Sequence, residues 1–473
     1  MVGEKMKNIK LMDVVKAVYA IDYTAPNRDI EMNNVEFDSR KITPDSLFVP
    51  LTSGQTDGHD YIQKAIENGA TATFWSKDPT EAPSDKIACI FVDDTLDAMQ
   101  RLAKYYREIL DPIVIGITGS NGKTTTKDMT ANALTAKYHV HKTQGNYNNE
   151  IGLPYTLLQM PETTEVVVCE MGMSNFGEIK ALSEIAQPDI AVITLIGESH
   201  LEFLGSRAGI AKAKLEILSG LKESGLFIYP GDEPLIQSEM PELNKAIDTL
   251  SIGFNETSDV YAKELIEEQS KTYFRTNLDE NVLCMIPVMG AYNVSNALIA
   301  LSIEKSINVP IEQAIFQLSQ FKLTANRLEW LKTKNGAQLL NDAYNASPTS
   351  MRAVLQAFST LQINEKGRKI AVLGDIRELG PHSEQFHREI ANDIETDKID
   401  VVYLFGEKMQ YLYEELKERY DDKHLIYEPE NHQKLIESLE KTVNPDDILL
   451  VKSSFGVDLL KVVTELTNKE TQS

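Results

Sequence analysis

The sequence predicts an α/β protein of three domains, a small mixed one followed by two with mostly parallel sheets. The chain has 473 residues, which is too long for a single hydrophobic core. Short apolar runs typical of buried strands alternate with helical patterns in two separate stretches, and this alternation favours parallel sheets. An Asp-Pro pair at residues 111–112 separates these stretches from the beginning of the chain, because the residue before a proline is disfavoured in a helix.

The first expected domain covers residues 1–110. It has strand-like runs at 47–49 and 90–92 and a helical pattern at 98–109. We expect these segments to form a small α/β unit that ends at the Asp-Pro break.

The second expected domain covers residues 111–330, and the third covers residues 331–473. The second has strand-like runs at 113–117, 166–169 and 190–193 and helical patterns at 127–136 and 208–218. The third has strand-like runs at 338–340, 370–373, 401–404 and 448–451 and a final helical stretch at 457–466. We expect the third to be a Rossmann-like, doubly wound domain, in which ligands bind at the carboxyl ends of the strands.

The composition is that of an ordinary globular protein, with 42% hydrophobic and 25% charged residues. No segment approaches the roughly 18 apolar residues of a membrane span, and residues 1–10 are too polar for a signal peptide. The three cysteines (Cys89, Cys169 and Cys284) are far apart and lack CxxC spacing, which argues against a disulfide framework or a structural zinc site. We therefore expect a cytoplasmic protein without membrane insertion.

The net charge is −24, and the sequence pI is about 4.8. Such a surface repels nucleic acid, so we expect no nucleic-acid partner. An anionic small molecule is not excluded, because helix N-termini and local basic groups can bind it against the overall field. We expect a monomer.

A glycine-rich turn follows the run at 113–117 and ends in Gly122-Lys123-Thr124, directly before a helical pattern. Glycines let backbone amides wrap round phosphate oxygens, and the helix N-terminus favours negative charge. Lys123 can reach the terminal phosphates of a nucleotide, and the Thr124 hydroxyl suits Mg²⁺. The second domain is therefore expected to be a P-loop ATPase domain that binds ATP.

The loop departs from the strict GxxxxGK[ST] pattern, because Ile117 occupies the first glycine position and the glycine stands at Gly119. The resulting sequence TGSNGKTTT, residues 118–126, resembles the phosphate loop of the Mur ligases, a family that builds the peptidoglycan precursor and has folylpolyglutamate synthase as a relative. Further motifs that carry the resemblance are Asp38-Ser39-Arg40, Asp57-Gly58-His59-Asp60, GNYNNEIGLP, Glu170-Met171-Gly172, HLEFLGS, AKAK, AYNVSNAL, NRLEW, DAYNASPTSM and LGDIRELG. These motifs occur in nearly the whole chain.

The resemblance implies an ATP site shared by the second and third domains. Its expected residues are Thr118, Gly119, Ser120, Asn121, Gly122, Lys123, Thr124, Thr125, Asn293, Asn296, Arg327 and Asp342. The amides of Asn293 and Asn296 suit adenine edges, although helix capping is an equal alternative. The Arg327 guanidinium can neutralise phosphate, and Asp342 is placed at the ribose. Tyr292 stands where relatives often have a histidine, which leaves its contact open.

The expected metal is Mg²⁺, held by Thr124, Glu170 and His200 and by Lys214 if that lysine is carbamylated. Glu170 and His200 each follow a strand-like run, so both are expected on the sheet edge that carries the phosphate loop. Lys214 rather than Lys212 is chosen because its distance from His200, 214 − 200 = 14 residues, matches the lysine of related ligases. Without the resemblance, these side chains are interpreted as solvated or structural.

The resemblance assigns the first domain to binding the UDP part of a substrate. The expected residues are Ser39, Arg40, Asp57, Gly58 and His59. The alternative is that these residues only form turns and carry surface charge. The candidate contacts to the sugar-peptide are Asn146, Asn148 and Asn149, and the candidates in the cleft beside Asp342 are Tyr344 and Asn345.

The implied activity is that of an ATP-dependent amide ligase acting through an acyl phosphate, with Lys123, Glu170, His200 and Lys214 as catalytic residues. The motifs are most similar to the branch of the family that adds D-alanyl-D-alanine to UDP-MurNAc-tripeptide. Alternatives are another Mur-type or folylpolyglutamate-synthase-like ligase, a phosphotransferase or motor NTPase, and a non-catalytic nucleotide-gated subunit. The sequence leaves open whether the third peptide residue is lysine or diaminopimelate.

Two positions depart from the family pattern. Relatives usually carry Lys-Gly-Ser-Arg or Lys-Gly-Ser-Asn near the C-terminus, where this chain has Lys452-Ser453-Ser454-Phe455. Arg377 adds a positive group near the expected dipeptide site, and the sequence assigns it no role.

Overall fold

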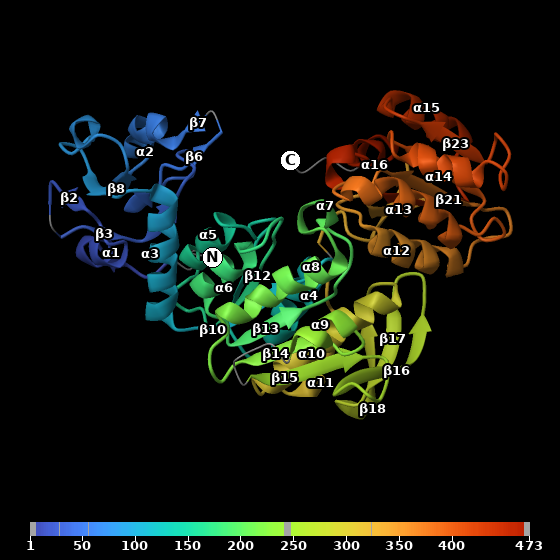
Figure 1. Cartoon of the computed structure of the whole chain (residues 1–473), viewed down its shortest axis with the longest axis horizontal. Coiled ribbons are helices and arrows are strands. Elements are labelled where there is room, and N and C mark those ends of the chain that lie inside the picture. The colour runs from blue at the N-terminus through green and yellow to red at the C-terminus, as the bar shows by residue number, and fades with distance from the viewer. Residues whose placement is uncertain (1–5, 28, 55, 241–246, 323, 468–473) are drawn as a thin grey trace.

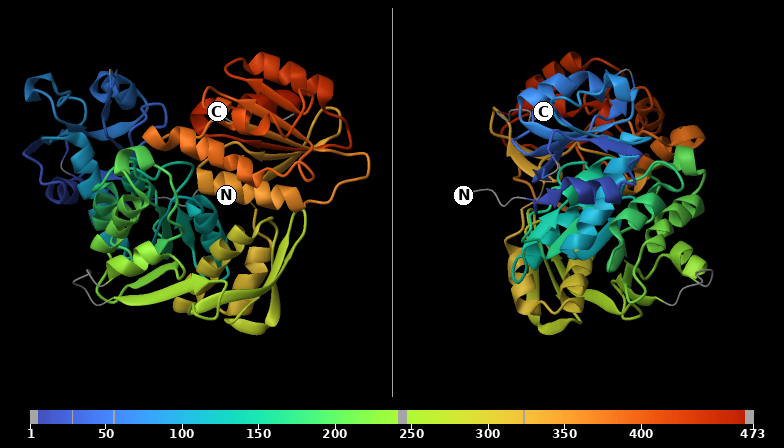
Figure 2. Two further views of the ribbon diagram at one scale, coloured as in Figure 1. Left: turned by 45° about the vertical axis from the view of Figure 1, so that its right-hand side comes forward. Right: turned by 90° about the vertical axis from the view of Figure 1, so that its left-hand side faces the viewer.

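The computed structural model describes residues 6–27, 29–54, 56–240, 247–322 and 324–467. Three α/β units lie side by side along the long axis, with the N-terminal unit at one end, the central unit in the middle and the C-terminal unit at the other end (Figure 1). The predicted fold class is confirmed. Two further views show that the N-terminal and C-terminal units both lie on the same side of the central one (Figure 2).

The N-terminal unit contains a five-stranded sheet in the order β2-β9-β8-β5-β4. These strands are β2 (Asp22–Thr24), β9 (Ala88–Phe91), β8 (Ala70–Trp75), β5 (Ser46–Phe48) and β4 (Asn34–Glu36). Only the β2–β9 pairing is antiparallel. The smaller elements are β1 (Ile9–Lys10), α1 (Leu11–Ala17), β3 (Glu31–Met32), β6 (Thr52–Ser53), β7 (Thr56–Asp57) and α2 (Ile62–Glu67). The predicted runs at 47–49 and 90–92 are confirmed as β5 and β9.

Helix α3 (Thr95–Leu110) joins the N-terminal unit to the central one. Its N-cap is Asp94, whose carboxylate accepts a hydrogen bond from the Asp97 backbone amide at 2.8 Å. It ends at Asp111, which adopts a left-handed conformation (φ 49°) before Pro112. The buried face of α3 shares one apolar core with both units, including Phe74 on one side and Leu157 on the other.

The central unit is built on a nine-stranded sheet in the order β11-β12-β10-β13-β14-β15-β16-β17-β18. The strands are β11 (Val140–Lys142), β12 (Val166–Glu170), β10 (Ile113–Thr118), β13 (Ile190–Ile193), β14 (Leu226–Pro230), β15 (Asp248–Gly253), β16 (Val260–Glu267), β17 (Thr272–Thr276) and β18 (Asp279–Ile286). The pairings are parallel as far as β16, whereas β16–β17 and β17–β18 are antiparallel. The predicted runs at 113–117, 166–169 and 190–193 are confirmed as β10, β12 and β13.

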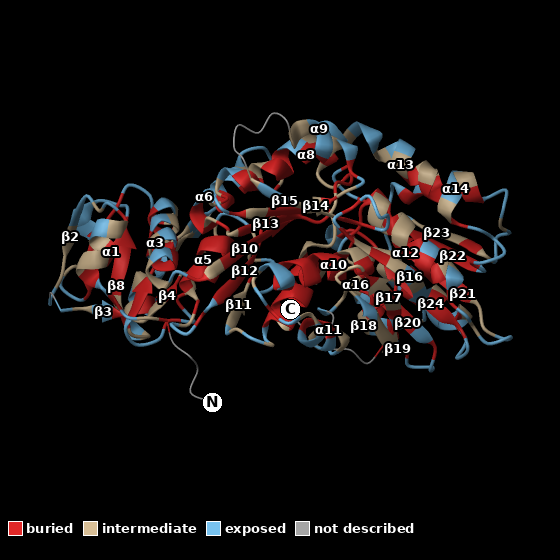
Figure 3. Cartoon of the chain, turned by 90° about the horizontal axis from the view of Figure 1, so that it is seen from below, coloured by how far each residue is buried: buried red, intermediate tan, exposed pale blue. Residues whose placement is uncertain are grey.

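Alternate residues of the central strands enter different cores, which explains the continuously apolar runs. Val114 and Val167 contribute to the core shared with α3, and Ile115 and Val168 contribute to the core on the opposite face. The first face is covered by α5 (Gly152–Leu158), α6 (Glu178–Ala186) and α8 (Arg207–Leu215), and the second by α4 (Lys123–Leu134), α10 (Ala291–Ser306) and α11 (Ile311–Ser319). The short helices α7 (Leu201–Leu204) and α9 (Pro234–Glu239) flank α8. Strands β10, β12 and β13 are buried on both faces (Figure 3).

The C-terminal unit has a six-stranded sheet in the order β19-β20-β24-β21-β22-β23, parallel except for β19–β20. The strands are β19 (Glu329–Lys332), β20 (Gln338–Asp342), β24 (Ile448–Lys452), β21 (Lys369–Gly374), β22 (Val401–Phe405) and β23 (Leu425–Glu428). Helices α12 (Pro348–Thr360), α13 (Ser383–Glu389) and α14 (Met409–Leu416) lie on one face, and α15 (His432–Thr442) and α16 (Leu460–Leu466) lie on the other. Because β19 pairs in this sheet, a boundary at residue 330 would divide a strand, and we propose a boundary before Glu329.

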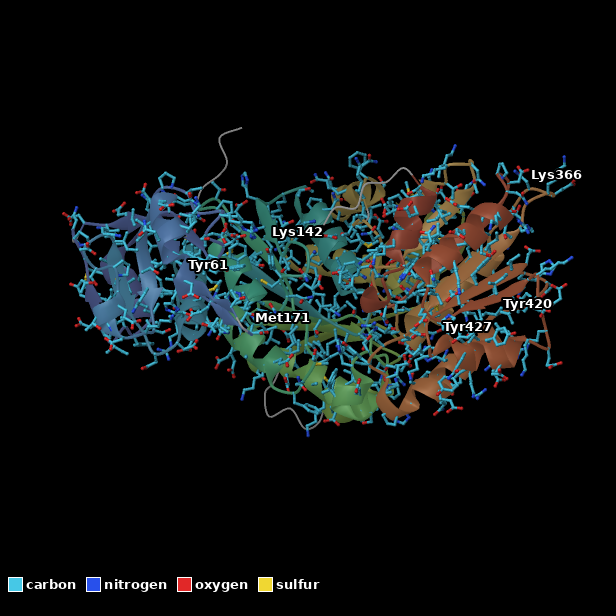
Figure 4. All side chains as sticks on the ribbon, turned by 90° about the horizontal axis from the view of Figure 1, so that it is seen from above. Tyr61, Lys142, Met171, Lys366, Tyr420 and Tyr427 are labelled. Atoms are coloured by element: carbon cyan, nitrogen blue, oxygen red, sulfur yellow. The ribbon has the colours of Figure 1, made fainter. Side chains whose placement is uncertain are left out.

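Figure 4 labels Tyr61 on the N-terminal unit, Lys142 and Met171 on the central unit, and Lys366, Tyr420 and Tyr427 on the C-terminal unit. Within the described ranges, no helix has both the length and the apolar character needed to cross a membrane.

Candidate active site

The phosphate loop connects β10 to α4 through two glycines that no other residue could replace without strain. Gly119 has φ 154°, and a Cβ added there would lie 1.9 Å from the Thr194 hydroxyl. Gly122 is left-handed (φ 84°), and a Cβ there would lie 2.7 Å from Asn296 Oδ1. The Lys123 ammonium folds back and donates to the Gly119 carbonyl at 2.7 Å. Close packing against Thr194 and Asn296 therefore requires glycine at both positions, and Lys123 is held over the turn.

A cavity of about 190 Å³ opens on this loop. Most of the residues expected at the nucleotide line it, namely Ser120, Asn121, Gly122, Lys123, Thr124, Thr125, Asn293, Asn296, Arg327 and Asp342. Thr118 and Gly119 do not line it, because Thr118 is fully buried at the end of β10 and Gly119 packs against Thr194. Tyr292, Thr349 and Lys452 line the same cavity.

The two asparagines at the start of α10 are buried and bonded within the protein. Asn293 donates to the Met289 carbonyl at 2.8 Å, and Asn296 donates to Asn293 Oδ1 at 3.1 Å. Asn296 Oδ1 accepts from the Thr126 hydroxyl at 3.0 Å, which ties α10 to α4. Neither side chain caps the helix, whose N-cap is Gly290. Next to them, burial and the nearby carboxylate of Asp342 raise the pKa of the Tyr292 phenol well above its ordinary value.

Lys452 also lines this cavity, although the sequence predicted no role for it and named it only within a motif that differs from the family pattern. It is buried, and its ammonium donates to Asp342 Oδ2 at 2.5 Å and to the Asn345 carbonyl at 3.1 Å. Lys452 ends β24 beside β20, so the rule that ligands bind at the carboxyl ends of parallel strands would have found it. Arg327 lies over the Tyr344 ring, with its guanidinium carbon 4.3 Å from the ring centroid.

Glu170 ends β12 with an incomplete set of partners. Its Oε1 accepts from the Asn148 amide at 2.9 Å, whereas its buried Oε2 accepts no hydrogen bond. The Lys127 ammonium lies 3.9 Å from Oε2. An unsatisfied buried carboxylate oxygen is costly unless a cation binds it, and oxygen is the donor that Mg²⁺ prefers. Glu170 therefore fits the expected metal role.

Lys214 and Lys212 differ clearly in burial, since Lys214 is 1% exposed and Lys212 is exposed to solvent. Burial, together with the positive charge of Lys123, lowers the pKa of the Lys214 amine well below its ordinary value. A neutral amine of this kind fits the chemistry of a carbamate.

His200 lies on the boundary between the central and C-terminal units. It adopts a left-handed conformation (φ 64°) before α7, and its Nδ1 is 2.6 Å from Glu378 Oε2. The two side chains form an ion pair when the imidazole is protonated. This contact lowers the pKa of the Glu378 carboxyl.

The metal ligands expected from the sequence do not form a conventional cluster. In the described residues, no group of three or more His, Cys, Asp or Glu side chains could hold a metal ion. The expected set contains only two side chains of these types, Glu170 and His200, and depends on Thr124 and a modified Lys214 for the rest. The assignment of these four residues to Mg²⁺ stays a prediction.

A second cavity, of about 380 Å³, adjoins the first. Its lining residues are Asn146, Glu198, Ser199, His200, Tyr344, Asn345, Ala346, Ser347, Arg377, Glu378, Leu379, Ser454, Phe455 and Gly456. Asn345 lines both cavities. Of the three asparagines expected at the sugar-peptide, only Asn146 reaches this cavity, because Asn148 binds Glu170 and Asn149 accepts from the Gly152 amide at 2.9 Å at the start of α5.

The residues expected at the UDP group lie in the N-terminal unit and line neither cavity. Asp57 pairs with Lys77 at 2.6 Å and with His59 at 2.7 Å, and these contacts hold the pKa of its carboxyl below the usual range. Arg40 is exposed and forms two hydrogen bonds to the Asp38 carboxylate. The remaining two are packed locally, since Ser39 is buried and a Cβ at Gly58 would lie 2.6 Å from the Leu51 backbone.

Hydrogen bonds join the central and C-terminal units beside the cavities. The Asn121 amide donates to the Ser347 hydroxyl at 2.9 Å, and the Thr349 hydroxyl donates to Glu198 Oε2 at 2.6 Å. The Glu202 amide donates to the Glu378 carbonyl at 3.1 Å. The phosphate loop is thus bonded directly to the N-terminus of α12 in the neighbouring unit.

Comparison with known families gives three consecutive matches along the chain. The Mur ligase family, catalytic domain, matches residues 31–107; the Mur ligase middle domain matches residues 117–303; and the Mur ligase, glutamate ligase domain, matches residues 326–455. Together these matches cover most of the chain.

Curated relatives extend the similarity to nearly full length. The chain is 43% identical over 435 residues to the UDP-N-acetylmuramoyl-tripeptide--D-alanyl-D-alanine ligase of Bacillus subtilis, covering 92% of this chain and 93% of that protein. It is 32% identical over 386 residues to the ligase of the same name from Escherichia coli, covering 80% and 82% of the two chains.

Solved structures agree with this placement. A MurF crystal structure from Acinetobacter baumannii matches with a TM-score of 0.87 and 28% identity, covering 98% of this chain and 100% of that one. A MurF ligase from Thermotoga maritima, solved in complex with ADP, matches with a TM-score of 0.78 and 28% identity over 92% and 96% of the two chains. The phosphate loop, the two adjoining cavities and these matches together place the chain in the Mur ligase family.

Proposed function

We propose that the chain is an ATP-dependent amide ligase that joins D-alanyl-D-alanine to UDP-MurNAc-tripeptide and so forms UDP-MurNAc-pentapeptide for peptidoglycan synthesis. The observation that carries the proposal is the shared wall at Asn345, which places a cavity on the phosphate loop directly beside a second cavity. The names of the relatives from Bacillus subtilis and Escherichia coli support the choice of substrates.

The proposed reaction needs ATP and two substrates in contact at the border of the cavities. A carboxylate oxygen of the tripeptide attacks the γ-phosphorus of ATP, the bond from that phosphorus to the bridging oxygen breaks, and ADP leaves. The dipeptide amine then attacks the acyl carbon of the resulting acyl phosphate, inorganic phosphate leaves, and the amine loses a proton to solvent. Catalysis of this kind depends mainly on positioning and charge neutralisation.

The chain's own residues take the following parts in this proposal. Lys123 neutralises the terminal phosphates, and the loop amides position them. Mg²⁺ would be held by Thr124, Glu170, His200 and a carbamylated Lys214, and when bound it would neutralise further phosphate charge. Glu170 is suited to this because its buried Oε2 accepts no hydrogen bond.

The other assignments complete the proposal. Ser39, Arg40, Asp57, Gly58 and His59 bind the UDP group, which makes the N-terminal unit a substrate-binding domain. The peptide is held by Asn146 and positioned through Asn148 and Asn149, and the dipeptide lies against Tyr344 and Asn345 in the C-terminal unit. We further propose that the enzyme acts as a monomer in the cytoplasm.

The test is phosphate release and product mass with ATP and UDP-MurNAc-tripeptide, comparing D-alanyl-D-alanine with single amino acids. We expect phosphate release to depend on the dipeptide and to match the amount of pentapeptide formed. Using lysine- and diaminopimelate-containing tripeptides in parallel identifies the third residue. Release that requires a single amino acid and ignores the dipeptide would reject this assignment in favour of another ligase, and release without any acceptor would favour a simple NTPase.

A further inference from the structure

Arg377 presents a positive charge to the cavity that His200 and Asn345 also line. It follows β21, and its backbone amide donates to the Ser454 hydroxyl at 3.0 Å. Its guanidinium lies against Gly456, where an added Cβ would be 2.2 Å from Nη1. The segments after β21 and after β24 therefore fix the position of Arg377 together, and Gly456 leaves the room that its guanidinium needs.

The Arg377 guanidinium has no carboxylate partner in the described part of the chain, although its cavity contains two acids. Glu378 is engaged by His200 at 2.6 Å, and Glu198 accepts from both the amide and the hydroxyl of Thr349. Other arginines of the C-terminal unit are paired, such as Arg388 with Glu384 at 2.9 Å and Glu415 at 2.8 Å. The charge of Arg377 is thus left available to a ligand.

An apolar surface lies beside this charge. The Phe455 side chain is 65% exposed, and its ring centroid is 5.9 Å from that of Tyr344. Both rings line the cavity with Arg377. An exposed ring in a cavity gains stability when an apolar group of the ligand covers it. The cavity therefore suits a small molecule whose carboxylate is flanked by a compact apolar group.

We propose that Arg377 binds the C-terminal carboxylate of the incoming dipeptide and that Phe455 packs against its terminal methyl group. A guanidinium offers paired donors that match the two oxygens of a carboxylate. Anchoring that end leaves the amino group of the dipeptide free for the part of the cavity that Asn345 shares with the nucleotide site. This inference rests on the proposed function and adds the residue that selects acceptors with a free carboxylate.

The test compares D-alanyl-D-alanine with D-alanyl-D-alaninamide, which has the same shape but no carboxylate, in wild type, Arg377→Ala and Arg377→Lys. We expect Arg377→Ala to raise the KM for the dipeptide by about 10- to 100-fold, the range for losing a hydrogen-bonded charge partner. The KM values for ATP and for the UDP-tripeptide should stay unchanged. Wild type should prefer the dipeptide over its amide, Arg377→Ala should use both equally, and Arg377→Lys should restore part of the preference.

The matched control is Arg388→Ala, an arginine of the same unit whose partners lie outside the cavity, and it should behave as wild type. A second readout is Phe455→Ala, which should lose the preference for D-alanyl-D-alanine over D-alanylglycine. An unchanged KM in Arg377→Ala, or an equal loss for dipeptide and amide, overturns the inference while the proposed function stands. If wild type uses a single amino acid instead, the proposed function fails, and the same comparison with that amino acid and its amide decides the role of Arg377.

Discussion

At the scale of single residues, two lysines near the phosphate loop differ in their surroundings. Desolvation and the charge of Arg327 lower the pKa of the half-buried Lys123 ammonium, and the charge of Glu170 offsets part of this effect. Lys214 has burial and the repulsion of Lys123 acting in the same direction. We therefore expect Lys214 to be the lysine that loses its proton, which gives the form that reacts with CO₂.

The first prediction concerns Lys214. With ¹³C-labelled bicarbonate, the ¹³C NMR spectrum of wild type should show a carbamate carbon signal, and Lys214→Ala should lack it. The kcat of Lys214→Ala should fall by about 100-fold or more, comparable to removal of a charge-stabilising group. Lys212→Ala is the control, because Lys212 is exposed on the same helix. A wild-type spectrum without the signal in fully active enzyme would contradict the prediction.

The second prediction concerns Glu304, a buried residue of α10 whose two carboxylate oxygens have no hydrogen-bond partner. Burial raises the pKa of its carboxyl well above the ordinary value of 4.5. Because the pKa is raised in the folded state, ionisation of Glu304 has no effect on stability below the ordinary value of 4.5, and stability falls as the pH rises from there towards the folded pKa, above which the loss is constant. Glu304→Met should therefore raise the free energy of unfolding by about 1–3 kcal/mol at neutral pH.

Denaturant titrations at several pH values measure this effect. The difference between Glu304→Met and wild type should shrink towards acidic pH, whereas Glu312→Gln, at an exposed position on the next helix, should track wild type throughout. A difference that is constant with pH would show that packing, and not ionisation, explains the change.

At the scale of elements, the sequence predicted β10, β12 and β13, but it missed β14, which is also buried on both faces, and the antiparallel strands β16 to β18. Strands β10, β12 and β13 are continuously apolar because helices cover both sides. Strands β16 to β18 form an antiparallel edge with alternating exposure, and their polar residues hide the pattern. Within the site, a local sequence motif predicts Lys123 and Thr124. The positions of Lys452 and Arg377 in the cavities depend on which strand ends, distant in the sequence, become neighbours in the fold.

The third prediction concerns the phosphate loop as an element. Gly119→Ala should abolish ATP binding, measured by calorimetry, because its Cβ would lie 1.9 Å from the Thr194 hydroxyl in a conformation that other residues rarely adopt. The double variant Gly119→Ala with Thr194→Ala should regain part of the affinity, since the clash is removed and the strain is kept. The control is Gly205→Ala, which also has a positive φ but has nothing within 4 Å of the added Cβ. Wild-type affinity in Gly119→Ala would show that the loop can rearrange.

At the scale of the whole molecule, the expected UDP residues and the two cavities belong to different units. None of Ser39, Arg40, Asp57, Gly58 and His59 lines either cavity, although the proposed substrate must reach from one to the other. The resemblance assigned these roles residue by residue, but no local pattern gives the relative placement of domains. A long substrate that is held at both ends favours closure of the units around it.

The fourth prediction is that the radius of gyration falls when an ATP analogue and UDP-MurNAc-tripeptide are added together. Small-angle scattering measures it, and either ligand alone should produce a smaller change, because only the pair connects the units. Lys123→Ala with both ligands serves as a control for binding at the phosphate loop. A radius that stays constant with both ligands bound would defeat the idea of closure.

Helix α3 has a consequence for how such a chain could be recombined. Its apolar face continues a single core from Phe74 in the N-terminal unit to Leu157 in the central one. A chimera that takes its N-terminal unit from a relative would have to match both sides of that helix at once. The C-terminal unit builds most of its interior from its own residues, with only a few such as Met289 and Leu328 contributed from before β19. We therefore expect that the C-terminal unit, which is proposed to bind the acceptor, can be exchanged between relatives. Exchange of the N-terminal unit is expected to fail.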